Sequence, residues 1–222
     1  MRRVTRKKLK QDEFVSIVDQ MIHWFSENWK PIVAALSAVV VVFLLWWGLS
    51  SWTQNRNAKA SQMLAATTEK MDKATTPEDR KAVEGELREV IDRYGRTPQA
   101  DEAHILLARM LIQDGSTDEA RRLLSAVSEK NKDTATVRVA TLDLLHLRVA
   151  SGQASEVAQE LQAMVAGKDP RLPRDVALYE LAKVSRAEGN VTQAREYLQK
   201  LVDDFPESPY AAEARRSLQE LG

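Results

Sequence analysis

The residue types that carry enzymatic chemistry are sparse in this sequence. It contains no cysteine, which excludes disulfides, thiolate metal sites and cysteine nucleophiles. The three histidines, His23, His104 and His146, stand alone and lack metal-ligand spacing such as His-Glu-x-x-His. Carboxylates are scattered, and no nucleophile elbow, phosphate loop or paired-carboxylate motif occurs. The sequence therefore predicts no enzyme, no cofactor, no metal site and no small-molecule substrate.

The charge distribution excludes a further class of ligand. Residues 1–30 carry seven basic and four acidic side chains, a net charge of +3, and the rest carries 25 basic and 28 acidic ones, a net of −3. Such a mildly acidic domain lacks the basic surface with which proteins neutralise the phosphates of DNA or RNA. We expect no nucleic-acid partner.

Residues 31–52, PIVAALSAVVVVFLLWWGLSSW, are the most apolar stretch of the chain. From Ile32 to Leu49 there are 18 residues without a formal charge, interrupted only by Ser37 and Gly48. About 20 apolar residues, each rising 1.5 Å, cross a hydrocarbon core roughly 30 Å thick. The stretch predicts a membrane-spanning helix, and a buried helix of a soluble core is the alternative.

The tryptophans support the membrane interpretation. Tryptophan prefers the membrane–water interface, because its ring is apolar while its N–H needs a polar partner. All five lie at the edges of the apolar stretch, and the 170 residues that follow contain none. We predict contact with lipid at the two interfaces for Trp24, Trp29, Trp46, Trp47 and Trp52.

The positive charges predict an orientation. Seven lysines and arginines precede the span, whereas three lie in residues 51–70. The positive-inside rule then places the N-terminus in the cytoplasm and the C-terminal domain across the membrane. A cleaved signal peptide is the alternative, because Ala58-Lys59-Ala60 fits the small-x-small cleavage pattern. A signal has an apolar core of about 7–15 residues and a short leader, so the longer core here favours a permanent anchor.

Residues 1–30 predict a cytoplasmic leader with two parts. MRRVTRKKLK has six basic residues and no acid, which beside a membrane predicts contact with anionic headgroups at about 1 kcal/mol per charge. Apolar residues then recur at helical spacing from Phe14 to Phe25, with polar residues on the other face. This amphipathic helix either docks on a partner or rests on lipid.

The domain beyond the span, residues 53–222, is predicted to be all-α. Alanine, leucine and charged helix formers dominate, and runs of alternating β-branched residues are absent. Gly115, Gly152 and Gly189 each end a helical pattern, at two equal intervals of 37 residues. A fixed period of this size predicts a repeat array. A plain helical bundle would share the composition but would not need the regular glycines.

Aligning the chain on these glycines shows a helix before and a helix after each one. A small residue five positions after the glycine lets the two helices cross closely, and a leucine follows one turn later. These positions are Ala120, Val157 and Ala194, then Leu124, Leu161 and Leu198. A Pro-containing turn also recurs, since residues 93–103 resemble residues 204–214. Asn190-Val191-Thr192 fits the glycosylation pattern, but Asn190 is expected to cap the second helix of its pair.

This pattern resembles the tetratricopeptide repeat (TPR), usually a 34-residue helix–turn–helix. The resemblance implies an α-solenoid of about three and a half repeats. Full units are expected at 101–134, 138–171 and 175–208, an earlier one begins with a helix at about 56–73, and residues 209–221 form a capping helix. In the middle unit Leu145 and Val157 replace small residues of the motif. The three extra residues per period are expected to lengthen a helix or its turn.

The whole layout is similar to one bacterial family of single-pass inner-membrane proteins with a periplasmic TPR-like domain, described as ancillary subunits of the SecYEG translocon with periplasmic chaperone links (YfgM-like). The resemblance rests on HWFSENWKPI before the span, WWGLSSW at its exit and NRNAKASQMLAATTEKM after it. It implies a periplasmic protein-interaction role, with translocon subunits or chaperones as partners. The TRKKLKQDEF leader is more basic than the family pattern, which leaves a different partner complex open.

The first helix of each pair would line the concave face of the solenoid, and its side chains are candidates for binding an extended or helical peptide. The predicted groove residues are Ile105, Arg109, Ile112, Leu142, His146, Val176, Tyr179, Lys183 and Arg186. The alternative is that they are ordinary solenoid residues without a ligand. Two other functions stay open: a structural subunit of another inner-membrane complex, and a secreted TPR adaptor released after Ala60.

Overall fold

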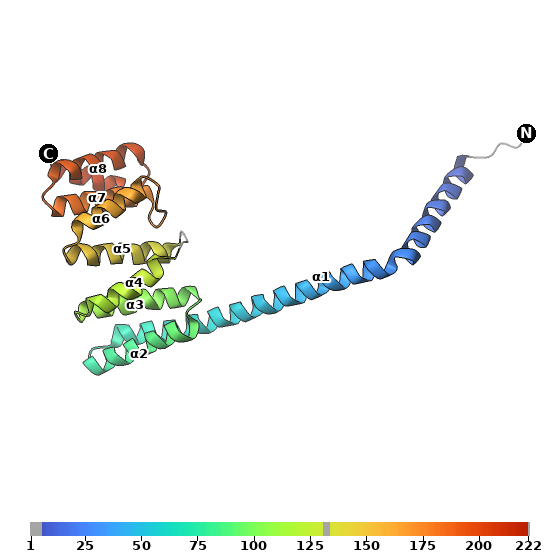
Figure 1. Ribbon diagram of the computed structural model, residues 1–222, viewed down its shortest axis with the longest axis horizontal. Coiled ribbons are helices and arrows are strands. Elements are labelled where there is room, and N and C mark those ends of the chain that lie inside the picture. Colours follow the sequence, from blue (N-terminus) through green and yellow to red (C-terminus); the bar gives the residue numbers. More distant parts are fainter. Residues whose placement is uncertain (1–5, 131–133, 222) are drawn as a thin grey trace, which may run out of the picture. The chain divides into compact units, whose positions relative to one another are not determined.

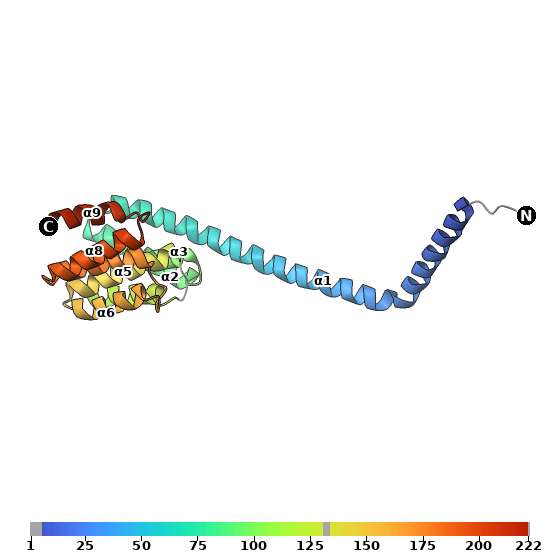
Figure 2. The same cartoon turned by 90° about the horizontal axis from the view of Figure 1, so that it is seen from above.

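The computed structural model describes residues 6–130 and 134–221, with side chains described for 29–31, 33–130 and 134–221. Within these ranges the chain is helical and contains no strand, which confirms the predicted all-α class. The helices in chain order are α1 (Arg6–Lys73), α2 (Pro77–Tyr94), α3 (Pro98–Gln113), α4 (Thr117–Ser128), α5 (Ala135–Ala150), α6 (Ala154–Val165), α7 (Arg174–Ala187), α8 (Val191–Asp204) and α9 (Ala211–Glu220) (Figure 1; α9 is labelled in Figure 2). The chain divides into two compact units, Met1–Asn55 and Arg56–Gly222.

The first unit contains the predicted span as part of α1. Its apolar window has a mean hydropathy of 2.5, and none of the window is buried. Every described side chain from Val33 to Leu49 is exposed, so these residues are not a helix packed in a core. By length and composition this helix can cross a membrane, although a signal sequence shares both properties. The side chains of the predicted amphipathic helix, 14–25, lie outside the described residues.

The second unit is a stack of antiparallel helix pairs. The end of α1 is its first helix: Leu64 shares a core cluster with Leu87 of α2, and the Thr67 hydroxyl donates to Glu86 Oε2 at 3.2 Å. Consecutive helices from α2 onward then pack on one another, and α3 also meets α5. Figure 1 shows this succession from α2 to α8, and Figure 2 shows the same stack from above. The stack is a TPR-like solenoid, as the sequence predicted.

The repeated glycines make the turn inside each helix pair. Gly115, Gly152 and Gly189 have φ of 80°, 84° and 80°, a left-handed conformation in which a Cβ would approach its own carbonyl too closely. After Gly115, the backbone N–H of Ser116 donates back to Leu111 O at 2.8 Å. The same bond follows the other two glycines at 2.9 and 2.8 Å, so the three turns share one helix-ending motif.

The conformation of these glycines gives a matched pair of substitutions. Gly152→Ala is expected to lower the free energy of unfolding by about 1 kcal/mol, because alanine is strained at a φ of 84°. Gly85→Ala, in the exposed middle of α2, is expected to raise it by about 0.5–1 kcal/mol through helix propensity. A Cβ at either position would meet nothing within 4 Å, so backbone conformation alone separates them. Thermal unfolding of the full chain in detergent micelles measures both, and equal shifts would contradict the assignment.

Helix starts in the first part of the stack use threonine caps followed by proline. Thr76 Oγ1 accepts from the Asp79 N–H at 3.1 Å while the Asp79 carboxylate accepts from the Thr76 N–H at 3.2 Å, a capping box. Thr97 caps α3 in the predicted Pro-containing turn. Asn190 does stand at the N-cap position of α8, but its side chain makes no capping hydrogen bond. Its ψ of 65° departs from the extended backbone of Thr76 and Thr97, so that detail of the prediction is wrong.

The extra residues of the 37-residue period were expected in a helix or its turn, and they lie in the connecting turns between the pairs. The connection 95–97 before α3 is short, whereas 129–134 before α5 and 166–173 before α7 are longer. Arg171 stabilises the connection 166–173 by donating hydrogen bonds to Asp169 and to Glu160, both at 2.5 Å. Glu160 also pairs with Arg148 of α5, so one carboxylate joins α5, α6 and the connection.

The middle pair packs differently from its neighbours. Ala120 and Ala194, both 0% exposed, stand where α3 meets α4 and where α7 meets α8, and those helices approach closely. In the middle unit the larger Leu145 and Val157 are fully buried at the corresponding places, and α5 and α6 make far fewer close backbone approaches. Larger side chains at a crossing hold helix axes apart. The unit that matches the repeat motif least well, 138–171, is therefore also the one whose two helices pack least closely.

Candidate protein-interaction site

The apolar members of the predicted groove contribute mainly to the core. Ile105 is 5% exposed and belongs to the first core cluster, so its prediction as a groove residue is wrong. α3 is packed by α2, α4 and α5, and its buried arc is therefore wider than a single stripe. Ile112, Leu142 and Val176 are half-buried and pack against core clusters, which leaves only part of each side chain for a partner.

The polar members take part in a ladder of side-chain pairs that joins successive first helices. Arg109 Nε on α3 lies 2.7 Å from Asp143 Oδ2 on α5, and His146 Nε2 lies 2.8 Å from Glu180 Oε2 on α7. Each rung spans 34 residues, because α3, α5 and α7 present equivalent positions at neighbouring levels of the stack. The ladder therefore shows which positions of neighbouring repeats lie side by side. Its members lie among the residues predicted to face a ligand.

Glu180 is the buried centre of this ladder, at 7% exposed. Its other oxygen, Oε1, accepts from Lys183 Nζ at 3.1 Å. Since Glu180 is an acceptor, His146 must carry its proton on Nε2 to donate to it. Burial raises the pKa of Glu180, but the hydrogen bond from His146 and the charge of Lys183 outweigh burial and hold this pKa below its ordinary value of 4.5.

The lowered pKa gives the fold a predictable acid response. Ionised Glu180 stabilises the folded state above about pH 4.5, and this contribution is lost as the pH falls through the lower folded-state value. We expect Glu180→Gln to be less stable than wild type at pH 7 and to lose less stability between pH 5 and pH 3. Unfolding curves of both proteins across that range measure the difference, and parallel pH profiles would contradict the role of Glu180.

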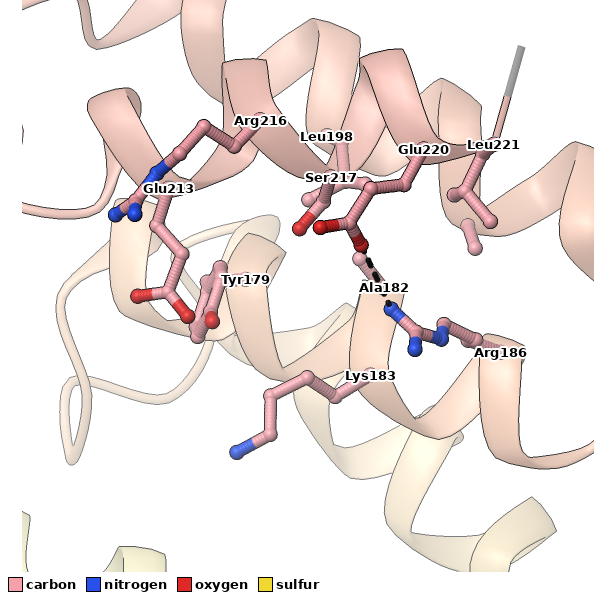
Figure 3. A pocket seen from close by; sticks show the side chains of 11 residues that line it. Tyr179, Ala182, Lys183, Arg186, Leu198, Glu213, Arg216, Ser217, Glu220 and Leu221 are labelled. Carbon is pink, nitrogen blue, oxygen red and sulfur yellow. Dashed lines mark ion pairs between the residues drawn. The ribbon is translucent and has the colours of Figure 1, made fainter.

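A cavity of about 250 Å³ opens beside the last rung, between α7, α8 and the capping helix α9 (Figure 3). Three predicted groove residues line it: Tyr179, Lys183 and Arg186. Tyr179 stacks on Tyr210 with ring centroids 4.9 Å apart, and Lys183 Nζ lies 5.7 Å from the Tyr179 centroid. The cavity thus offers an aromatic wall and cationic side chains, which suit recognition of a polypeptide segment.

Tyr179 is held in its neutral form. Burial and the hydrogen bond to Glu213 raise the pKa of its hydroxyl far above the ordinary value. The residue is therefore a hydrogen-bond donor and a flat apolar surface, and not a nucleophile. Across the cavity Arg186 Nη1 lies 3.9 Å from Glu220 Oε2, with both side chains more than half exposed.

Sequence reasoning missed the contribution of α9. It predicted a helix that covers the last repeat, whereas α9 also lines the cavity with Glu213, Arg216, Ser217 and Glu220. The recurring Pro-containing turn was the available signal. It relates residues 93–103 to 204–214, which makes α9 equivalent to the first helix of another pair.

A second cavity, of about 350 Å³, lies at the other end of the stack between the last turn of α1, α2 and α3. Of its lining residues, only Arg109 was predicted. The sequence did not indicate this cavity, because it forms only where the end of α1 packs beside α2 and α3. Its lining is Met71, Asp72, Ala74, Arg80, Leu106, Arg109, Met110 and Gln113. The methionines provide adaptable apolar surface.

The tryptophans with described side chains are exposed on α1. Trp29, Trp46, Trp47 and Trp52 are 49%, 64%, 60% and 57% exposed, and the Trp46 ring lies 6.1 Å from that of Phe43. Such exposure of large apolar rings fits a helix whose surroundings are apolar, and their contact with lipid stays a prediction. Trp24 lies outside the residues whose side chains are described.

The histidines and carboxylates with described side chains do not gather into a cluster. Among residues 29–31, 33–130 and 134–221, no group of three or more histidine, aspartate or glutamate side chains could hold a metal ion. His104 Nδ1 lies 2.7 Å from Ala100 O within α3, so this histidine is satisfied by its own helix.

Comparisons with known proteins agree with the fold. The model of the tetratricopeptide repeat-like domain family matches residues 22–169, and a tetratricopeptide repeat model matches residues 176–208, close to the unit predicted at 175–208. No curated protein matches the chain.

Solved structures show the same architecture. The nearly identical TPR-like repeats of a Podosopora anserina kinesin light chain protein superpose with a TM-score of 0.53 at 19% identity, covering 74% of this chain and 85% of that one. That structure is a point variant, and the parent repeats match with the same score and identity, covering 86% of their chain. At this identity the likeness concerns the fold alone. TPR repeats are typically non-catalytic scaffolds that bind other proteins. Because the first family model covers about two thirds of the residues, this chain belongs to the tetratricopeptide repeat-like domain family.

Proposed function

We propose that this chain is a single-pass bacterial inner-membrane protein whose periplasmic TPR-like domain binds other proteins, as an accessory, chaperone-linked subunit of the protein translocon. The observation that carries the proposal is an unburied, charge-free membrane-length helix in the same chain as an interaction solenoid. The family match begins at residue 22, before the apolar stretch, so that stretch and the first repeats fall within one family pattern.

The anchor would act by confinement. A solenoid held beside its membrane partner meets that partner at a high effective concentration, so weak groove contacts suffice. The distribution of positive charge supports a cytoplasmic N-terminus and a periplasmic domain. The translocon as partner rests on the family resemblance of the sequence around the span.

Photo-crosslinking in intact membranes tests the partner and the surface together. A crosslinker at His146, exposed on the first helix α5, is compared with one at Gln159, exposed on the second helix α6 of the same pair. We expect translocon or chaperone subunits to be captured from His146 at least several-fold more than from Gln159. Equal capture from both positions would contradict binding in the groove.

A replacement of the span separates the proposal from its alternatives. Residues 32–49 are exchanged for an unrelated apolar helix of equal length. Capture from His146 that survives the exchange supports groove binding, whereas complete loss identifies a structural subunit held through its membrane segment. The mass of the mature protein decides the remaining alternative, because loss of residues 1–60 would identify a secreted adaptor.

A further inference from the structure

The ladder has a third rung that lacks its acid. Arg109, His146 and Lys183 follow one another at intervals of 37 residues, as do the acids Asp143 and Glu180. One further interval leads from Glu180 to Ser217 on α9. The Pro-containing turns give the same correspondence, because residues 93–103 and 204–214 are three such intervals apart. Ser217 therefore occupies the place at which the two preceding levels carry a carboxylate.

The side chains near this position reflect the missing acid. Lys183 donates to Glu180, one turn back on its own helix, although Glu180 already accepts from His146. One buried carboxylate thus serves two donors. Lys183 and Ser217 line the same cavity of about 250 Å³ (Figure 3). The cavity is open beside Ser217, at the place where the two earlier rungs of the ladder have a carboxylate.

Among the side chains that line the cavity, cations outnumber carboxylates. Three cations line it, Lys183, Arg186 and Arg216, against the two carboxylates Glu213 and Glu220. Glu213 accepts from the Tyr179 hydroxyl, and Glu220 is 68% exposed at 3.9 Å from Arg186. Both acids therefore have partners of their own, and Lys183 is the cation whose acid is shared.

We propose that the cavity between α7 and α9 receives the carboxylate of an aspartate or glutamate side chain of a bound protein, which takes the place beside Lys183 that Asp143 and Glu180 take at the earlier rungs. The stacked Tyr179 and Tyr210 form an aromatic wall next to it for an adjoining apolar residue. This inference rests on the proposed function, since it names the chemistry of the partner segment that the groove selects.

Zero-length crosslinking tests the site with a defined probe. The probe is a 12-residue alanine-rich peptide with one leucine and one glutamate, blocked at both ends, so that its only carboxylate is the glutamate side chain. A carbodiimide activates this carboxylate, and a lysine amine within contact displaces the activating group to form an amide. Mass spectrometry of the full chain in detergent micelles then compares coupling at Lys183 with coupling at Lys200, which is exposed on α8.

We expect coupling at Lys183 to exceed coupling at Lys200 by about tenfold, the effect of one charge-assisted hydrogen bond. Equal coupling at the two lysines would overturn the proposal. A second peptide, with glutamine in place of glutamate and a free C-terminus, offers only a terminal carboxylate. Preference of Lys183 for this peptide would also overturn the proposal, because the site would then recognise chain ends.

Two variants of Ser217 complete the test. Ser217→Glu supplies the missing acid, so it is expected to raise the unfolding temperature, to form an internal link to Lys183 and to reduce peptide coupling there about tenfold. Ser217→Gln has nearly the same size without the charge and should keep the coupling. Equal behaviour of the two variants would overturn the proposal, because space, and not charge, would then govern the site.

The outcome is separable from that of the proposed function. If His146 still captures partners in membranes while the peptide shows no preference for Lys183, the carboxylate site alone is wrong. If the preference is found but capture from His146 equals capture from Gln159, the proposed function alone is wrong.

Discussion

Replacing Val40 and Leu44 together by arginine is expected to release the protein from the membrane. Val40 lies at the centre of the 18-residue charge-free segment, and Leu44 lies one helical turn later. Each arginine near the centre of a spanning helix costs about 2.5–3.5 kcal/mol of insertion free energy, so the pair costs about 5–7 kcal/mol. That cost exceeds what the remaining apolar residues can offset, and the helix should fail to insert.

Alkaline extraction of membranes measures this change. Wild-type protein should stay in the membrane pellet, whereas the double-arginine protein should appear in the soluble or aggregated fraction. The control exchanges the same two residues for other apolar ones, Val40→Leu with Leu44→Val, and should stay in the pellet. Retention of the double-arginine protein in the pellet would contradict a lipid-spanning role for the segment.

Leu161→Ala is expected to give the largest loss of folding stability in the repeat domain. Leu161 on α6 is 0% exposed and lies in the second core cluster with Leu145 and Met164. Removing three buried carbons and leaving a cavity costs about 2–5 kcal/mol in packed cores. α5 and α6 cross loosely, so few other contacts hold this pair together, and the middle of the stack should open first.

Chemical unfolding of the full chain in detergent micelles, followed by circular dichroism, measures the loss. The matched control is Leu123→Ala on α4, because Leu123 is only partly buried against the first cluster and should cost clearly less. Hydrogen exchange locates the effect, with faster exchange expected in α5 and α6 than in α8. A uniform increase over all helices would indicate that the solenoid unfolds as one cooperative block.

The ladder and the cavity show how much of the candidate site can be predicted from the position of each residue in the TPR motif. Tyr179, Lys183 and Arg186 were placed on the concave side by their position in the repeat, and they do line one cavity. Ile105 held an equivalent position but is buried, because α3 has helices on three sides. Motif position fixes the helix and the turn on which a residue lies, whereas its exposure depends on how many neighbours that helix has.

The sequence by itself determined the features that depend on a few adjacent residues. A glycine with positive φ, a threonine–proline cap and apolar residues at helical spacing act within one or two turns, so helix type, turn position and the membrane-length segment are readable from the chain. What only the tertiary structure decided depends on the register between levels of the stack. Arg109 pairs with Asp143 and His146 pairs with Glu180, each across 34 positions, and Ser217 lines a cavity with Lys183, also 34 positions away. These contacts are set by the angle and distance at which neighbouring helix pairs pack.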